Sequence, residues 1–410
     1  MAYNTLGELM RALECEKYPE CWEPVFNEAM ADFEQNGCPL ADEEYYENLH
    51  NKYGMLNLYR PLYNQAAVEL AQNEPLARFM VLICRILRDR KNWKANLAGF
   101  ERPKPKEGTS SFVYDMFDAL ALCSLADICY ENMRKRKIPN EISRVVMDLP
   151  EKGIREYMIR HDGRPGHNLL EWLQYAIDGE YYRIGRFEIQ LNKRFGIKAK
   201  VFKNQEKGIV VLADGAELHK SGFALGAKGF EDKKGSWVAN LKETETEWIG
   251  YRYLENAYVE NTPVILKKDD WTVVLSKDDY VVDLHIPSDG KLTPESVDET
   301  IALVKDFMQK YYPDYDYKAF TCSSWLLDPQ LSSLLGENSN ISIFSSRFTR
   351  MALKSDGDSV FYFVFRKPDT DRASRLNLEC LPEQTTLERI LKGHYLEGKV
   401  IYGTAGFFFA

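Results

Sequence analysis

The chain has 410 residues, of which 45% are hydrophobic and 28% charged, a balance typical of two or three globular domains. Its formal net charge of −9 disfavours binding to nucleic acid or to an anionic membrane, because such surfaces require a basic footprint. An anionic small ligand needs only a local positive site, so this charge leaves such a ligand possible.

The cysteines and the N-terminus indicate a cytoplasmic protein. Eight cysteines without a Cys-x-x-Cys pair predict buried, reduced thiols. The first residues have neither the basic nor the apolar segment of a signal peptide. No apolar run approaches the ~18 residues that a membrane helix needs. We therefore expect a cytoplasmic protein with no membrane or nucleic-acid partner.

Residues 1–145 are predicted to form an all-helical N-terminal domain. Apolar side chains recur there with a 3.6-residue period, most clearly at Leu76, Met80, Ile83 and Leu87. One long apolar helix is expected over 112–133, and the basic run that follows it suits the negative end of a helix dipole. Shorter helices are expected over 140–149, 152–161 and 169–177.

The second domain, assigned to 146–410, changes character after these helices. Short β-branched and aromatic runs predict strands over 181–191, 199–202, 208–212, 264–266, 271–275 and 281–286. A loop or hairpin is expected over 230–248. Further along, strands are expected over 317–324, 341–348, 360–365 and 399–402, and helices over 293–312, 329–335 and 387–391.

The most informative stretch lies between the strand at 281–286 and the helix that follows it. Pro287 ends the strand, a polar turn occupies 288–292, and Thr293-Pro294 opens the helix. The first N–H groups of a helix are unpaired and its dipole is positive there, so this arrangement can hold an anion. A cofactor phosphate is the ligand that this pattern predicts first.

Five motifs resemble those of a bacterial acyltransferase family that joins a helical N-terminal N-acyltransferase domain to a GNAT-like C-terminal domain. They are Gly-Arg-Pro-Gly at 163–166 with Trp172, Tyr-Arg-Ile-Gly-Arg-Phe-Glu at 182–188, Leu-His-Ile-Pro at 284–287, Ser-Trp-Leu-Leu-Asp-Pro-Gln-Leu at 324–331, and Ser-Asn-Ile at 339–341 with Arg347-Phe348. The resemblance implies an α+β (α/β) fold in which a mixed, splayed β-sheet with flanking helices follows the helical domain. It also implies transfer of an acyl group from acyl-CoA or acetyl-CoA to an amine acceptor.

The residues of the turn depart from the pattern of well-characterised GNAT enzymes. Those enzymes hold the CoA pyrophosphate with an Arg/Gln-x-x-Gly-x-Gly/Ala loop. This chain has Ser-Asp-Gly-Lys-Leu-Thr at 288–293, with a single glycine, and Asp289 is unfavourable beside a diphosphate. Lys291 and the helix N-terminus offset that charge. The predicted cofactor-binding residues are Ile286, Ser288, Gly290, Lys291, Leu292 and Thr293.

The resemblance places the catalytic candidates at the ends of two strands. His285 is the candidate base, since an amine must lose a proton to attack a thioester. Ser324 is a candidate polar partner for the leaving thiolate, with capping of the turn as its alternative role. Cys322 is either an acyl acceptor, which needs an adjacent base, or a small buried side chain.

Five residues are candidates for binding the acceptor. Strand alternation places Arg186 and Glu188 on one face and Arg183 on the other. They bind an anionic substrate or face solvent. Trp325 lines a cleft or fills the core, and Asn340 positions an acceptor or belongs to a structural turn.

Other chemistries have little support in the sequence. His161, Asp162 and His167 straddle a Gly/Pro turn without metal-ligand spacing, so no metal is expected. The leading hypothesis is a GNAT-type N-acyltransferase, and the alternative is a non-catalytic GNAT-like protein that binds a ligand or partner. An open slot between the two strands would favour the enzyme, and side chains filling it would favour the binding protein.

Overall fold

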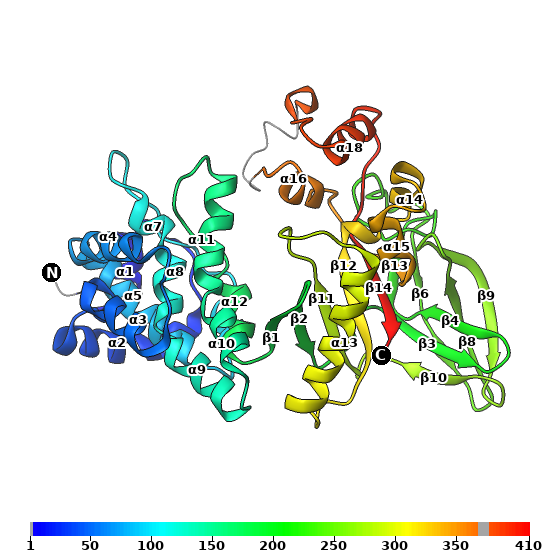
Figure 1. Ribbon diagram of the computed structural model, residues 1–410, viewed down its shortest axis with the longest axis horizontal. Helices are drawn as coiled ribbons and strands as arrows, with labels where there is room; N and C mark the ends of the chain where they lie inside the picture. The colour runs from blue at the N-terminus through cyan, green and yellow to red at the C-terminus, as the bar shows by residue number, and fades with distance from the viewer. Residues whose placement is uncertain (1–2, 368–376) are drawn as a thin grey trace. The chain divides into compact units, whose positions relative to one another are not determined.

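The computed structural model describes residues 3–367 and 377–410, and the chain divides into two compact units, Met1–Tyr182 and Arg183–Ala410 (Figure 1). The first unit is helical and the second contains the sheets, which confirms the predicted fold class. The helices of the first unit continue to Ile177 rather than to the predicted boundary at 145. They do so because α10 (Asn140–Met147), α11 (Leu149–Arg160) and α12 (Leu170–Ile177) pack on α8 (Phe117–Cys123) and α9 (Ala126–Lys135). This packing buries Met147, Ile154 and Leu170.

The helical unit is built around α5, which contacts α1, α2, α4, α6 and α8 and buries most of its side chains. Its helices are α1 (Leu6–Ala12), η1 (Glu20–Trp22), α2 (Glu23–Asn36), η2 (Pro39–Ala41), α3 (Glu43–Tyr53), α4 (Arg60–Ala71), α5 (Glu74–Arg88), α6 (Trp93–Asn96), α7 (Phe112–Asp115), α8 (Phe117–Cys123), α9 (Ala126–Lys135), α10 (Asn140–Met147), α11 (Leu149–Arg160) and α12 (Leu170–Ile177). Across both units, no helix in the described residues is long and apolar enough to span a bilayer.

The single helix predicted over 112–133 is instead three helices. Breaks fall at Met116 and at Ser124-Leu125, and Leu125 leaves helical geometry with a φ of −108° and a ψ of 6°. The Ser124 hydroxyl donates to the Ala121 carbonyl at 2.7 Å, which is the kind of local bond that competes with the helix ladder. The apolar pattern correctly predicted that this segment is buried, but it did not predict the breaks that divide it into three helices.

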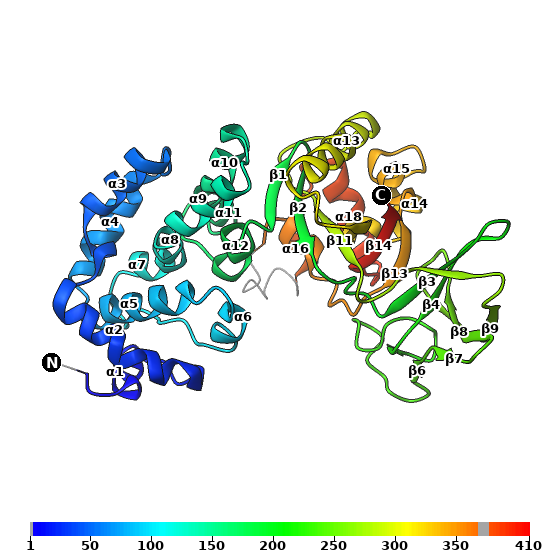
Figure 2. The ribbon, with the colours of Figure 1, turned by 90° about the horizontal axis from the view of Figure 1, so that it is seen from below.

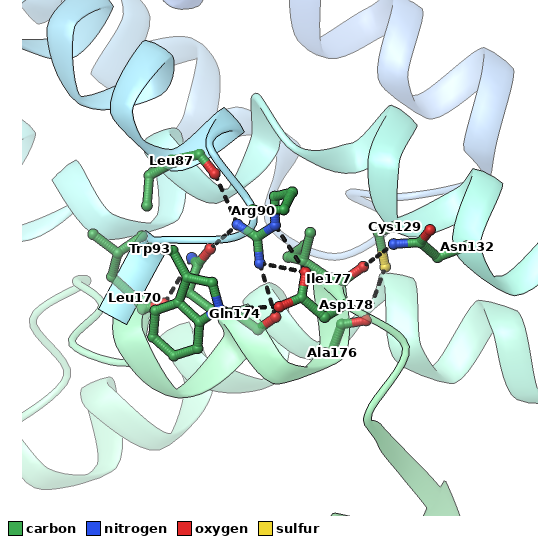
Figure 3. A network of polar contacts seen from close by, with 10 residues as sticks. All are labelled: Leu87, Arg90, Trp93, Cys129, Asn132, Leu170, Gln174, Ala176, Ile177 and Asp178. Atoms are coloured by element: carbon green, nitrogen blue, oxygen red, sulfur yellow. Dashed lines mark hydrogen bonds and ion pairs between the residues drawn. The ribbon is translucent and has the colours of Figure 1, made fainter. Parts of the chain in front are cut away.

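A polar network holds the end of α12 (Figure 3). Arg90 donates from Nε to Asp178 Oδ1 at 2.8 Å and from Nη2 to the Gln174 carbonyl at 3.1 Å. Trp93 Nε1 donates to Asp178 Oδ2 at 3.0 Å, and Asn132 Nδ2 donates to the Ile177 carbonyl at 2.8 Å. The last carbonyls of a helix have no partner within it, so these side chains satisfy them where the helical region ends.

The second unit contains two six-stranded sheets and a two-stranded one. The first sheet has the order β1-β2-β11-β12-β14-β13, and the second has the order β10-β3-β4-β8-β7 with β9 paired to β8. The strands are β1 (Tyr181–Ile184), β2 (Phe187–Asn192), β3 (Ala199–Asn204), β4 (Gly208–Ala213), β5 (Ala216–Leu218), β6 (Trp237–Ala239), β7 (Lys242–Glu243), β8 (Glu247–Tyr253), β9 (Val259–Lys267), β10 (Thr272–Leu275), β11 (Tyr280–His285), β12 (Tyr317–Ser324), β13 (Thr349–Ala352) and β14 (Thr404–Phe409).

The two faces of the first sheet pack against different layers. One face contributes Val281, Ala319 and Phe407 to a core shared with Val201 and Val211 of the second sheet. The other face carries Phe187 and Phe320, and the Phe187 ring lies 5.9 Å from that of Phe344 in α15. Figure 2 shows α13 beside β11 on the side away from the second sheet.

Within residues 183–367 and 377–410, the helices of the second unit are α13 (Pro294–Tyr311), η3 (Trp325–Leu327), α14 (Gln330–Leu335), α15 (Asn340–Ser346), α16 (Ser359–Phe363), η4 (Leu378–Cys380) and α18 (Thr386–Leu396). The strands predicted over 341–348 and 360–365 are wrong, because these runs form α15 and α16. Ser339 caps α15 by accepting from Ser342 N at 3.2 Å. The last strand is β14 rather than 399–402, and it pairs with both β12 and β13.

Candidate active site

The strands β11 and β12 pair in parallel along only part of their length. Their register runs from Tyr280↔Tyr317 to Asp283↔Thr321. Beyond that point β11 stays paired with β2, through Leu284↔Ile189 and His285↔Glu188. On the other side β12 stays paired with β14 as far as Ser324↔Thr404. Each strand therefore keeps its outer neighbour while the two separate from each other, and we call the residues beyond Asp283 and Thr321 the parted ends.

A polar face lies at this separation. Residues opposite each other in a ladder share a face, so Asp283 and His285 lie with Gln190, Glu188 and Thr321. Thr321 Oγ1 donates to Asp283 Oδ1 at 2.9 Å. His285 Nε2 lies 3.3 Å from Gln190 Oε1 and 3.6 Å from Asp283 Oδ2. The sheet thus brings together a histidine, two carboxylates, an amide and a hydroxyl.

The surroundings of His285 orient its ring. Nε2 faces the oxygens of Gln190 and Asp283, one from each of two strands. The His285 side chain is 26% exposed, whereas Glu188 and Gln190 are buried. An imidazole oriented by its neighbours and still open to solvent has the properties that a general base requires.

Cys322 and Ser324 alternate onto the opposite face of β12. Ser324 Oγ accepts from Leu326 N at 3.2 Å and caps η3. Cys322 is fully buried, and burial together with Asp283 raises its thiol pKa well above the usual value. This environment disfavours a thiolate nucleophile. The catalytic roles proposed for both residues remain predictions, and the geometry supports their structural alternatives.

Ser323 stands in the same predicted strand end as Cys322 and Ser324, but Ser324 was chosen over it as the candidate from the sequence. It is exposed and shares the face of Thr321, next to the point where the strands separate. Strand alternation would have selected it over Ser324 once the register with Asp283 was known. The sequence shows two adjacent serines, but the pairing of Thr321 with Asp283 cannot be read from it.

The turn after Pro287 does lead into a helix, as predicted. Thr293 Oγ1 caps α13 by accepting from Ser296 N at 3.2 Å, and Pro294 is the first helical residue. Ser288 and Gly290 are exposed, while Leu292 is buried. The N-terminus of α13, the end of a helix where an anion is favoured, therefore lies beside an accessible turn, and its anion-binding role remains a prediction.

Arg183 and Arg186 reach this turn from the hairpin that β1 and β2 form. The single strand predicted over 181–191 is wrong, because Gly185 has a φ of +50° and turns the chain there. A Cβ on Gly185 would lie 2.5 Å from Thr300 Oγ1 of α13, so only glycine fits. The prediction that Arg186 and Glu188 share one face, which assumed an unbroken strand, therefore loses its basis.

The arginine side chains bind the backbone and side chain of the turn. Arg186 donates from Nη2 to the Gly290 carbonyl at 2.8 Å and from Nε to the Lys291 carbonyl at 3.1 Å. Arg183 Nη2 donates to Asp289 Oδ1 at 3.1 Å. Residues predicted separately as substrate-binding and cofactor-binding thus form one cluster.

Three other candidates lie outside both groups. Trp325 belongs to an apolar cluster with Leu331 and Phe361, and Ile286 packs against that cluster. Asn340 is the exposed first residue of α15. Their ligand-binding roles remain predictions. In the part of the chain that the structure describes, no group of three or more His, Cys, Asp or Glu side chains is arranged to hold a metal.

A family model described as a GNAT-like C-terminal domain matches residues 181–408, more than half of the chain. No curated protein matches. A mutant acyltransferase in complex with octanoyl-CoA has 20% sequence identity and a TM-score of 0.62, with 98% of each chain covered. An acyltransferase in complex with decanoyl-CoA and teicoplanin has 19% identity, the same TM-score and the same coverage. These structures share the fold of this chain.

Proposed function

Because the chain belongs to the family with a GNAT-like C-terminal domain, we propose that it transfers an acyl group from a CoA-type thioester to an amine on a small-molecule acceptor. The observation that carries the proposal is the separation of β11 and β12 beyond Asp283 and Thr321, two residues before His285. Solved structures with the same fold were obtained with octanoyl-CoA and decanoyl-CoA, which supports acyl-CoA as the donor.

In this proposal the thioester lies between the parted ends. Backbone N–H groups there polarise its carbonyl, because a strand that has lost its neighbour has donors to spare. The amine attacks the carbonyl carbon, the N–C bond forms and the C–S bond breaks. His285 takes the proton that the amine loses, and this proton is then passed to the leaving thiolate, which departs as the free thiol of CoA. Ser323, on the same face, is the polar group proposed nearest to the leaving sulfur.

The turn and the arginines are proposed to hold the donor. The first turn of α13 offers N–H groups to a diphosphate, and Lys291, Arg183 and Arg186 add positive charge. Ile286, Ser288, Gly290, Leu292 and Thr293 remain the predicted contacts of the donor in this region. Glu188, paired with His285 in the ladder, is proposed to help orient the amine.

One observation favours the alternative of a ligand-binding protein without catalysis. Asp289 places a carboxylate in the turn where a diphosphate is expected, and it is already bound to Arg183. A protein that kept the fold but lost the donor would tolerate such a residue. In that case the polar face would bind a ligand without turnover.

Acyl transfer is tested with the full-length protein, octanoyl-CoA and acetyl-CoA as donors, and a panel of small amines as acceptors. We expect CoA to raise the melting temperature, since it binds only the folded state, and we expect release of free thiol that depends on the acceptor. No shift in melting temperature at millimolar CoA would overturn the proposal. A shift without thiol release for any amine would support the non-catalytic alternative.

A further inference from the structure

Arg183 and Arg186, the arginine pair, form a preorganised cationic site next to the N-terminus of α13. Arg186 N donates to Thr300 Oγ1 at 2.8 Å, which fixes the hairpin against the helix. The Arg186 side chain is only 9% exposed and that of Arg183 is 20% exposed. Two guanidinium groups are thus held beside the end of an 18-residue helix where an anion is favoured.

The hydrogen-bonding capacity of the arginine pair is not filled within the described residues. Nη1 of each arginine is buried and has no hydrogen-bond partner. A buried donor without an acceptor costs free energy, and native proteins contain few of them. The pair therefore has donors left over for a ligand that brings several oxygens.

Asp289 is the anion that the arginine pair holds now. Its Oδ1 lies 3.1 Å from Arg183 Nη2 and 3.8 Å from Arg186 Nη1. Burial and the neighbouring Arg183 lower the pKa of Arg186, while Asp289 and Glu188 raise it. One carboxylate with two oxygens is a partial match for two guanidinium groups, each of which can bind an oxyanion with two parallel bonds.

We propose that Asp289 is an internal counter-ion that occupies the arginine pair in the ligand-free protein and is displaced when the diphosphate of the acyl donor binds. The inference rests on the proposed function, because it takes the donor to be of the CoA type. Asp289 is suited to this exchange because it lies in an exposed turn and its side chain is 40% exposed. Its displacement costs part of the donor's binding free energy, so Asp289 sets how tightly the donor is held.

The test is isothermal titration calorimetry of the full chain with two probes, inorganic pyrophosphate and CoA. Asp289→Asn removes the competing charge, so we expect both probes to bind on the order of tenfold more tightly than to the wild type. The gain should shrink at high salt, because ions screen exposed charges. Arg186→Gln in the Asp289→Asn background should remove the gain.

Asp316→Asn is the matched control. It makes the same change in net charge at an exposed residue. Asp316 directly precedes β12, so it lies at the opposite end of this strand from the parted ends. It should leave pyrophosphate binding unchanged. Melting temperatures of all variants identify any loss of folding. If Asp289→Asn melts at a lower temperature than the wild type, Asp289→Ser is used in its place.

The outcomes separate this inference from the proposed function. If wild-type protein binds CoA and transfers acyl groups but Asp289→Asn binds pyrophosphate no more tightly, the counter-ion role is overturned and the function stands. Weaker binding by Asp289→Asn would also overturn it, because Asp289 would then be shaping the turn for the ligand. If Asp289→Asn binds pyrophosphate more tightly but no acyl transfer is detected, the counter-ion role of Asp289 is supported and the proposed acyltransferase function is contradicted.

Discussion

Two carboxylates of the second unit, the buried Asp328 and the half-buried Asp283, differ in their main partners. Asp328 is 2% exposed and its shortest hydrogen bonds come from two backbone N–H groups, Tyr402 N at 2.6 Å and Gln330 N at 2.9 Å, with Gln330 Nε2 further away at 3.2 Å. Asp283 is 16% exposed and its partners are the side chains of Thr321 and His285. Backbone donors are part of the fold and cannot exchange protons with a ligand. Side-chain partners at the separation of β11 and β12 can, so the comparison sets a structural carboxylate against one that is available for the proposed chemistry.

The largest expected effect lies on the Asp283 side of this comparison. His285→Gln keeps a hydrogen-bonding side chain but removes the base, so we expect kcat/KM for acyl transfer to fall by about 10²- to 10⁴-fold. The melting temperature should change little, because the side chain is partly exposed. Steady-state kinetics at saturating donor measure the effect. His161→Gln, in the helical unit, is the control, and equal rates for both variants would show that His285 is not the base.

The second-largest effect is expected at Asp328, where a substitution should change the stability of the protein rather than its catalysis. Asp328→Asn places an amide donor against backbone donors, and we expect it to cost about 1–3 kcal/mol of unfolding free energy. Asp298→Asn is the control, since Asp298 forms an exposed ion pair with Arg347 that is worth about 0–1 kcal/mol. Urea denaturation measures both, and equal losses would remove the distinction between the two carboxylates.

The cost of Asp328→Asn should also depend on pH. Burial raises the pKa of Asp328, so the folded protein holds this proton more tightly than the unfolded chain does. The group's contribution to stability is therefore lost as pH rises from the ordinary carboxyl pKa through the raised one. We expect the difference between wild type and variant to be greatest at acid pH and to decline over that interval.

The smallest expected effect concerns Cys322. Its burial and raised pKa indicate a structural side chain, so Cys322→Ala should lower kcat by less than about twofold and cost about 1 kcal/mol of stability. Iodoacetamide labelling followed by mass spectrometry gives an independent measure. The exposed Cys21 and Cys380 should react while Cys322 does not. Loss of transfer in a stably folded Cys322→Ala variant would restore the acyl-acceptor role.

The sequence predicted the central part of the site well because local signals mark it. Pro287 ends β11, Thr293 and Pro294 start α13, and β12 has the predicted bounds 317–324. The runs at 341–348 and 360–365 were assigned as strands because a short apolar run does not distinguish a strand from a buried helix. The hairpin at Gly185 was missed because its turn depends on a close approach to Thr300, far along the chain.

The chemistry of the site was less predictable than its elements. His285 follows from its place at the end of a strand, but its partners Gln190 and Asp283 follow only from the register of three strands. The same register decides between Ser323 and Ser324. Likewise, the contact between Arg183 and Asp289 joins residues more than a hundred positions apart, and no local pattern indicates it.

The position of β14 in the first sheet has a consequence for how the protein folds during synthesis. β12 ends at Ser324, whereas its outer neighbour begins at Thr404. A nascent chain that has not yet reached Thr404 exposes β12 as an unpaired edge, a state prone to association with other chains. Pairing across so long a separation is also slow. The separation between β11 and β12 is therefore among the last features to mature on the ribosome, and chaperone binding should be strongest just before that strand emerges.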